Sequence, residues 1–128
     1  MPAYGALSSA PTAKNQPAAA LYPGDSMQLI SAEASTDVAK WPASIAVAIP
    51  PHPGGYKPIL FAIEFATTPA NNVVIQGAME DREAAYQTLF TSAAKRQDYY
   101  ADDGSFKFYR VGPCTSTGGG NLTVTVRR

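Results

Sequence analysis

The sequence predicts an all-β protein, an antiparallel β-sandwich of about seven or eight strands with a jelly-roll-like arrangement. Two observations carry this prediction. Several short segments alternate apolar and polar residues with a period of two, as half-buried strands do, and no long helical pattern interrupts them. Most of the eleven prolines and ten glycines fall between these segments, where turns are expected.

The clearest strand covers residues 57–65, where Ile59, Phe61, Ile63 and Phe65 share one face. We expect it to neighbour the β-branched segment 73–78 in one sheet. The composition of residues 80–85 predicts one helical turn, and residues 95–104 are expected to form a polar connection. The remaining strands are predicted at residues 27–31, 41–49, 86–91, 105–111 and 122–126.

The most regular pattern lies near the carboxyl end. In the segment 105–111, alternation predicts that Phe106 and Phe108 face the core, while Lys107 and Tyr109 face outward beside Arg110 on a solvated or interface surface. Residues 118–120 then form a glycine turn into the closing strand.

The strand at residues 41–49 has one large and one small face. Its small face, Ser44, Ala46 and Ala48, would let another layer approach closely, either the chain's own arm or another subunit. Ordinary sheet packing explains the same row equally well.

The first 25 residues differ in composition from the rest of the chain. Residues 1–25 are rich in Pro, Ala and Ser without periodicity, which predicts an extended amino-terminal arm ahead of a sandwich domain over residues 26–128. A solvated tail has no need of apolar anchors, yet the arm contains four, which are the predicted partner-binding residues: Tyr4, Leu7, Leu21 and Tyr22. The alternative is a flexible terminus that binds nothing.

Composition narrows the classes of function. Only 16% of residues are charged and the formal net charge is zero, so there is no basic field for nucleic acid. No segment has the roughly 18 consecutive apolar residues that span a bilayer, and the amino terminus lacks a signal-peptide pattern, which predicts synthesis in the cytoplasm. A surface this poor in charge suggests that partners cover part of it.

The reactive residue types form no convincing site. Cys114 has neither a CxxC spacing nor a second cysteine, and His52 is the only histidine, in a Pro-rich loop. Asp98, Asp102 and Asp103 lack the spacing of an EF-hand and are expected to hydrogen-bond within a turn. We therefore predict no catalytic, cofactor or metal site and no enzyme activity.

Several strand and turn motifs occur together between residues 57 and 128. They are Phe65-x-x-x-Pro69, Val73–Ala78, Ala85–Leu89, Phe106–Val111, and Gly118-Gly119 before the Thr/Val tail. Over roughly residues 57–128 this set resembles small virion proteins of tailed bacteriophages, the capsid decoration or cement proteins built on a jelly-roll-like sandwich.

The resemblance implies a structural role without site chemistry. It implies a homo-oligomer, a dimer or trimer, on the capsid exterior of the virion, bound to an HK97-type major capsid protein and to copies of itself. Two alternatives stay open. One is a carbohydrate-binding β-sandwich in which Tyr99, Tyr100 or Trp41 stacks on sugars, and the other is a tail or baseplate component.

Overall fold

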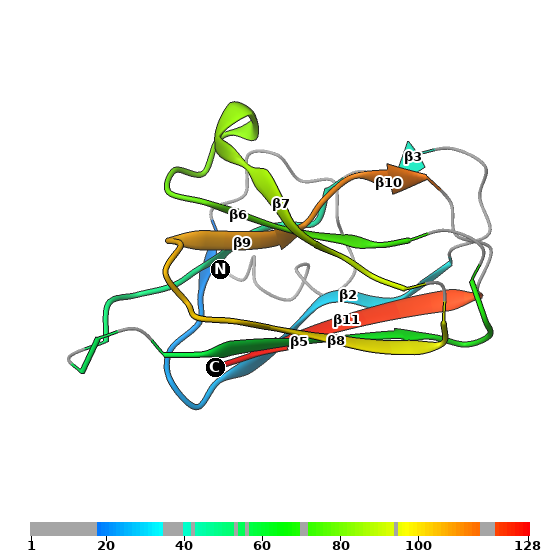
Figure 1. Ribbon diagram of the computed structural model, residues 1–128, viewed down its shortest axis with the longest axis horizontal. Helices are drawn as coiled ribbons and strands as arrows, with labels where there is room; N and C mark the ends of the chain where they lie inside the picture. Colours follow the sequence, from blue (N-terminus) through cyan, green and yellow to red (C-terminus); the bar gives the residue numbers. More distant parts are fainter. Residues whose placement is uncertain are drawn as a thin grey trace, which may run out of the picture.

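The computed structural model describes residues 18–34, 40–41, 43–52, 54–55, 57–69, 72–93, 95–115 and 120–128. Nearly all regular structure in these residues is β-strand (Figure 1). The exception is one 3-10 turn, η2 (Glu83–Ala85). The strands are β1 (Ala19–Ala20), β2 (Ser26–Ala34), β3 (Lys40–Trp41), β4 (Val47–Ala48), β5 (Ile59–Phe65), β6 (Val74–Ala78), β7 (Gln87–Thr91), β8 (Gln97–Asp102), β9 (Phe108–Val111), β10 (Cys114–Thr115) and β11 (Asn121–Arg127).

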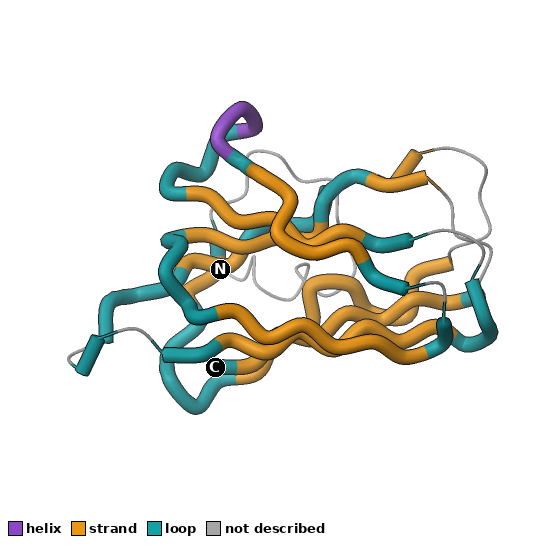
Figure 2. Tube along the Cα trace, in the orientation of Figure 1, coloured by secondary structure: helices purple, strands orange, loops and turns teal. Residues whose placement is uncertain are grey.

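Two sheets are stacked face to face, which confirms the predicted β-sandwich (Figure 2). One has the strand order β1-β4-β9-β6-β7 and the other the order β2-β11-β5-β8. A separate two-stranded ladder pairs β3 with β10. In Figure 1 the first sheet lies above the second, and the β6–β7 connection projects away from both.

The pairing within the sheets is that of a jelly roll. Four antiparallel pairs are nested along the chain: β2 with β11, β4 with β9, β5 with β8, and β6 with β7. Successive pairs alternate between the two sheets, so the chain is folded as one long hairpin that is rolled up around its core. Only β1, which pairs parallel to β4, departs from the antiparallel pattern.

The core forms where the alternating apolar faces of the two sheets meet. β5 turns Ile59, Phe61, Ile63 and Phe65 inward, as predicted, and all four are at most 1% exposed. The central strand β11 alternates in the same way. Other fully buried core side chains are Leu21, Ile30, Val47, Val73, Ile75, Tyr109, Val111, Leu122, Val124 and Val126.

Two predictions about strand arrangement are wrong. β5 and β6 lie in different sheets, because the jelly-roll path crosses the sandwich between them. Residues 97–102 form the edge strand β8 instead of a polar connection. That strand has no fully buried residue, since its inward side chains lie at the margin of the core, and its sequence therefore looks like a loop.

The orientation predicted for the segment 105–111 is confirmed for Phe106 and Lys107 but wrong for Phe108 and Tyr109. Tyr109 and Val111 face the core, whereas Phe108 and Arg110 point to the outer side of the sheet. Phe106 lies before β9 and still packs against the core, so alternation does not run through the whole segment. Nor are β9 and β11 partners across a turn, because they belong to opposite sheets.

Gly104 lies in the connection between β8 and β9, where the chain passes from one sheet to the other. Its φ is +81°, and a Cβ there would overlap the backbone carbonyl of Lys57. Gly104→Ala is expected to lower the free energy of unfolding by about 2–4 kcal/mol, from backbone strain and steric overlap together. Gly24→Ala is the matched control, because Gly24 has φ +92° but nothing within 4 Å of a Cβ. Equal losses in urea denaturation would contradict this assignment.

Candidate functional site

The part of the predicted arm that the structure describes belongs to the sandwich. Ala19 and Ala20 pair with β4, and the amide of Leu21 donates to the carbonyl oxygen of Ala48 at 2.8 Å. Leu21 is 0% exposed and is therefore part of the protein's own core, which removes it as a partner anchor in this conformation. Tyr22, in contrast, is 56% exposed. Tyr4 and Leu7 lie outside the described residues.

Arg128 holds this segment in place. Its guanidinium donates to the carbonyl oxygens of Leu21 at 2.8 Å and Pro50 at 2.7 Å, so it bridges the end of β1 and the end of β4. Backbone hydrogen bonds from Gly24 to Arg128 and from Arg128 to Asp25 complete the contact. The carboxyl end of β11 therefore fixes the point at which the chain enters the domain.

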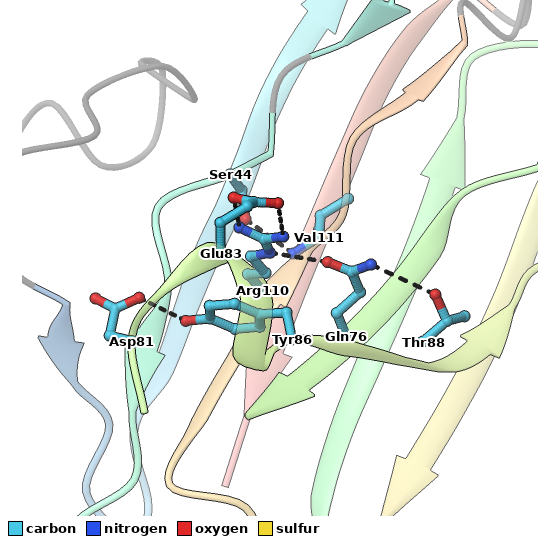
Figure 3. A network of polar contacts seen from close by, with 8 residues as sticks. All are labelled: Ser44, Gln76, Asp81, Glu83, Tyr86, Thr88, Arg110 and Val111. Atoms are coloured by element: carbon cyan, nitrogen blue, oxygen red, sulfur yellow. Dashed lines mark hydrogen bonds and ion pairs between the residues drawn. The ribbon is translucent and has the colours of Figure 1, made fainter. Parts of the chain in front are cut away.

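A buried arginine organises the outer face of the β1-β4-β9-β6-β7 sheet (Figure 3). Arg110, on β9, is only 6% exposed. Its guanidinium donates to both carboxylate oxygens of Glu83, at 2.9 and 2.7 Å, and its Nε donates to Gln76 at 2.9 Å. It also lies 3.9 Å from the centre of the Tyr86 ring, within the range of a cation–π contact.

These contacts hold the β6–β7 connection against the sheet. Glu83 and Tyr86 come from that connection, while Arg110 and Gln76 come from the sheet beneath it. The Tyr86 hydroxyl donates to Asp81 at 2.6 Å, which continues the network along the loop. Because the Glu83 carboxylate is 76% exposed, solvent screens the ion pair, and the packing and the bidentate geometry contribute most. The site is a structural clasp that holds this connection to Arg110 on the outer face.

The small face predicted for residues 41–49 is largely enclosed. Ser44 and Ala46 are each 6% exposed, and Ala48 is half-buried. The Ser44 hydroxyl accepts the Val111 amide at 2.9 Å, so it joins the strand region to β9. Ser44 thus has a structural explanation.

Asp102 joins the two sheets at one end of the sandwich. It accepts a hydrogen bond from the Tyr100 hydroxyl at 2.6 Å, on its own strand, and another from the Tyr109 hydroxyl, which belongs to the opposite sheet. The Gly104 amide is a third donor, at 3.1 Å. Tyr100 also stacks on Phe90, with ring centres 4.8 Å apart, and is therefore held inside.

The other acidic residues singled out in the sequence make local hydrogen bonds, as predicted. Asp98 accepts the amides of Ala93 and Tyr99, at 2.7 and 2.9 Å. Asp103 accepts from Ser105, and these hydrogen bonds hold the pKa of its carboxyl below the usual value. In the described part of the chain, no three His, Cys, Asp or Glu side chains are grouped so that they could hold a metal ion. Nor does any helix there have the length and apolar character needed to cross a membrane.

The outer face of the β2-β11-β5-β8 sheet differs from the clasped face, and we call it the open face. The strand registers place these side chains on it: Ser26, Gln28, Leu60, Ala62, Glu64, Gln97, Tyr99, Ala101, Thr123, Thr125 and Arg127. Among the outward side chains of these strands that the structure describes, Glu64 and Arg127 are the only charged ones. Tyr99 is 58% exposed, while Ala62 and Thr125 at the centre are half-buried by their neighbours.

The open face is the candidate functional site. It is low in charge, carries an exposed aromatic ring, and has small side chains at its centre, a combination typical of protein surfaces that contact a partner. Of its residues, only Tyr99 was predicted to bind anything, as a ring that stacks on sugars. Strand alternation does identify them as one face, but it does not tell which of the two outer faces lacks a clasp among the described residues.

Comparisons with protein-family models, with curated proteins and with solved structures found no match. The fold and the class, a jelly-roll β-sandwich, therefore rest on the strand topology described above.

The contrasting environments of two adjacent residues give a direct test of the arm's role in the fold. Leu21→Ala is expected to lower the free energy of unfolding by about 2–5 kcal/mol, because it opens a cavity in the core. Tyr22→Ala, the matched control, should change it by no more than about 0.5 kcal/mol. Urea denaturation measures both. A small loss for Leu21→Ala would mean that residues 18–25 are a detachable arm.

Three phenols predict how stability depends on alkaline pH. Burial, followed by the hydrogen bond to an Asp carboxylate, raises the pKa of Tyr86, Tyr100 and Tyr109 above the usual value of 10.0. Their contribution is complete below pH 10 and is lost as pH rises, because the unfolded chain ionises first.

Above about pH 10, each phenol should therefore lower the free energy of unfolding by roughly 1.4 kcal/mol per pH unit. Urea midpoints at a series of pH values measure this slope. Tyr109→Phe should make the slope shallower by the share of one phenol, and an unchanged slope would contradict the prediction.

Proposed function

We propose that this chain is a structural virion protein that binds the outside of a bacteriophage capsid and reinforces it, as a decoration or cement protein. The observation that carries the proposal is the open face, a sheet surface on a jelly-roll scaffold whose described outward side chains include one acidic and one basic residue. Such a surface suits contact with protein, since few charges have to be desolvated.

The described side chains support a binding role in another way. Asp102, Arg110 and Arg128 all make structural contacts that connect strands or loops. Their geometry explains the fold without reference to a substrate. On a capsid lattice, where many copies sit side by side, modest contacts per copy are enough, because the effective concentration is high.

The carbohydrate-binding alternative retains one residue. Tyr99 is exposed on a sheet face, where a ring can stack on a sugar. Tyr100 is engaged by Phe90 and Asp102, which makes it unsuitable. The Trp41 side chain lies outside what the structure describes.

Copy number in purified virions tests the proposal. Quantitative mass spectrometry of virions of the phage that encodes this chain should find on the order of hundreds of copies per particle, as lattice coverage requires. A handful would indicate a tail or baseplate component, and absence from virions would overturn a virion role altogether.

A truncation then tests the arm. Because Leu21 is in the core, the deletion should remove residues 1–17, which contain Tyr4 and Leu7, and leave β1 intact. We expect a folded domain with lost capsid occupancy. Unchanged capsid occupancy would mean that the arm does not take part in binding.

A glycan array, with Tyr99→Ala as its control, tests the carbohydrate-binding alternative.

A further inference from the structure

The two charged residues of the open face, Glu64 and Arg127, lie on opposite sides of its centre. Ala62 on β5 is paired with Thr125 on β11, and together they form the centre of the face. Glu64 is the next residue after Ala62 on β5 whose side chain points outward, and it is paired with Thr123. Arg127 is the next such residue after Thr125 on β11, toward the opposite end of the face, and it is paired with Leu60.

Within one copy, these charges are too far apart to pair directly. Their two positions are separated by four residues along the strands, or about 13 Å at the usual rise per residue. Glu64 instead accepts a hydrogen bond of 3.3 Å from Gln97. The face therefore presents a negative and a positive end on either side of an uncharged centre.

We propose that the open face docks on the open face of a second copy of this chain, through a two-fold axis that runs across the strands at Ala62 and Thr125. This rotation exchanges the two ends of the face. It places Glu64 of one copy over Leu60 of the other copy, next to Arg127 on the adjacent strand, and it does so twice. The inference deepens the assembly role proposed above and rests on it for its biological setting.

Charge complementarity selects this axis over the other in-plane axis. A two-fold axis along the strands leaves each end facing the same end of the second copy. Glu64 would then lie over Thr123 and Arg127 over Leu60, with no pairing of opposite charges. Both rotations stack the two sheets with nearly aligned strands, the usual packing of β-sheets, so the charges alone decide between them.

The side chains along the axis suit close approach. The register places Gln28, Thr125, Ala62 and Tyr99 side by side across the four strands. On the axis each of these meets its own copy, so small residues face small residues at the centre. Two Tyr99 rings, each 58% exposed in one copy, meet at the β8 edge.

The edge of the same sheet is less suited to pairing with a second copy. The amide of Tyr99, on the edge strand β8, donates to its neighbour Asp98 at 2.9 Å. A side chain thus occupies a backbone donor that an added strand would need. Asp98 and Asp102 would also bring like charges together if two β8 strands were paired antiparallel.

The size of the face predicts a weak dimer. Four strands about 4.8 Å apart and seven residues long cover roughly 400 Å² of flat area per copy. This is about half of the roughly 800 Å² per partner in a standard interface. We therefore expect a dissociation constant of roughly 0.1–1 mM, which a capsid lattice would strengthen through effective concentration.

A charge-reversal cycle tests the proposal, with the full chain followed by sedimentation equilibrium up to about 2 mM at low salt. Glu64→Arg and Arg127→Glu should each weaken dimerisation at least about fivefold, since attraction becomes repulsion at two symmetric places. The double variant should recover to within about threefold of wild type. Added salt should weaken the wild-type dimer.

Matched controls lie on the β6–β7 connection. Glu80→Arg and Arg82→Glu change the net charge equally at exposed positions away from the open face and should leave dimerisation unchanged. Ala62→Arg should abolish the dimer by steric obstruction, whereas Ala84→Arg, at an exposed site on η2, should not. Melting temperatures verify that each variant is folded.

A wild-type chain that stays monomeric at about 2 mM overturns the proposal, as does a double variant no better than the single reversals. Failure of the dimer proposal can be told apart from failure of the proposed virion function. A monomeric chain that is abundant in virions overturns only the dimer. A chain that dimerises through the open face but is absent from virions overturns only the virion role.

Discussion

Each of the two sheets can bury only one face against the other, and this constraint governs the rest of the molecule. The inner faces supply an apolar core with Phe61 and Phe65 on one side and Val47 and Val111 on the other. Burial of these side chains is the dominant stabilising term. Each sheet also has an outer face that packs against no second sheet, and the two outer faces differ.

One outer face binds a connecting segment of the same chain. Arg110 points outward from this face and contacts Glu83 and Tyr86, which holds the β6–β7 connection to the sheet. The open face has no comparable clasp among the described residues, and it carries few charges. A sheet surface with so few charges is the feature that most favours an assembly role.

Two ionisable side chains join separate elements of this fold. Asp102 accepts tyrosine hydroxyls from both sheets, and Arg128 connects the carboxyl end of the chain to Leu21 and Pro50. Buried polar groups of this kind favour one register over its alternatives, because a shifted strand would leave them without hydrogen bonds. A rigid scaffold is what a surface-binding protein requires.

The sequence by itself determined the fold class and the strands with strong local alternation, such as β5 and β11, because their pattern records burial directly. It also predicted the short helical turn now seen as η2. Only the tertiary structure decided that Tyr109 faces inward, since its hydroxyl needs Asp102 of the opposite sheet. Likewise, Leu21 is buried because β1 pairs with β4, a contact that no local pattern encodes. Alternation defines two faces of a strand, but contacts between distant segments select which face is buried and which remains open to a partner.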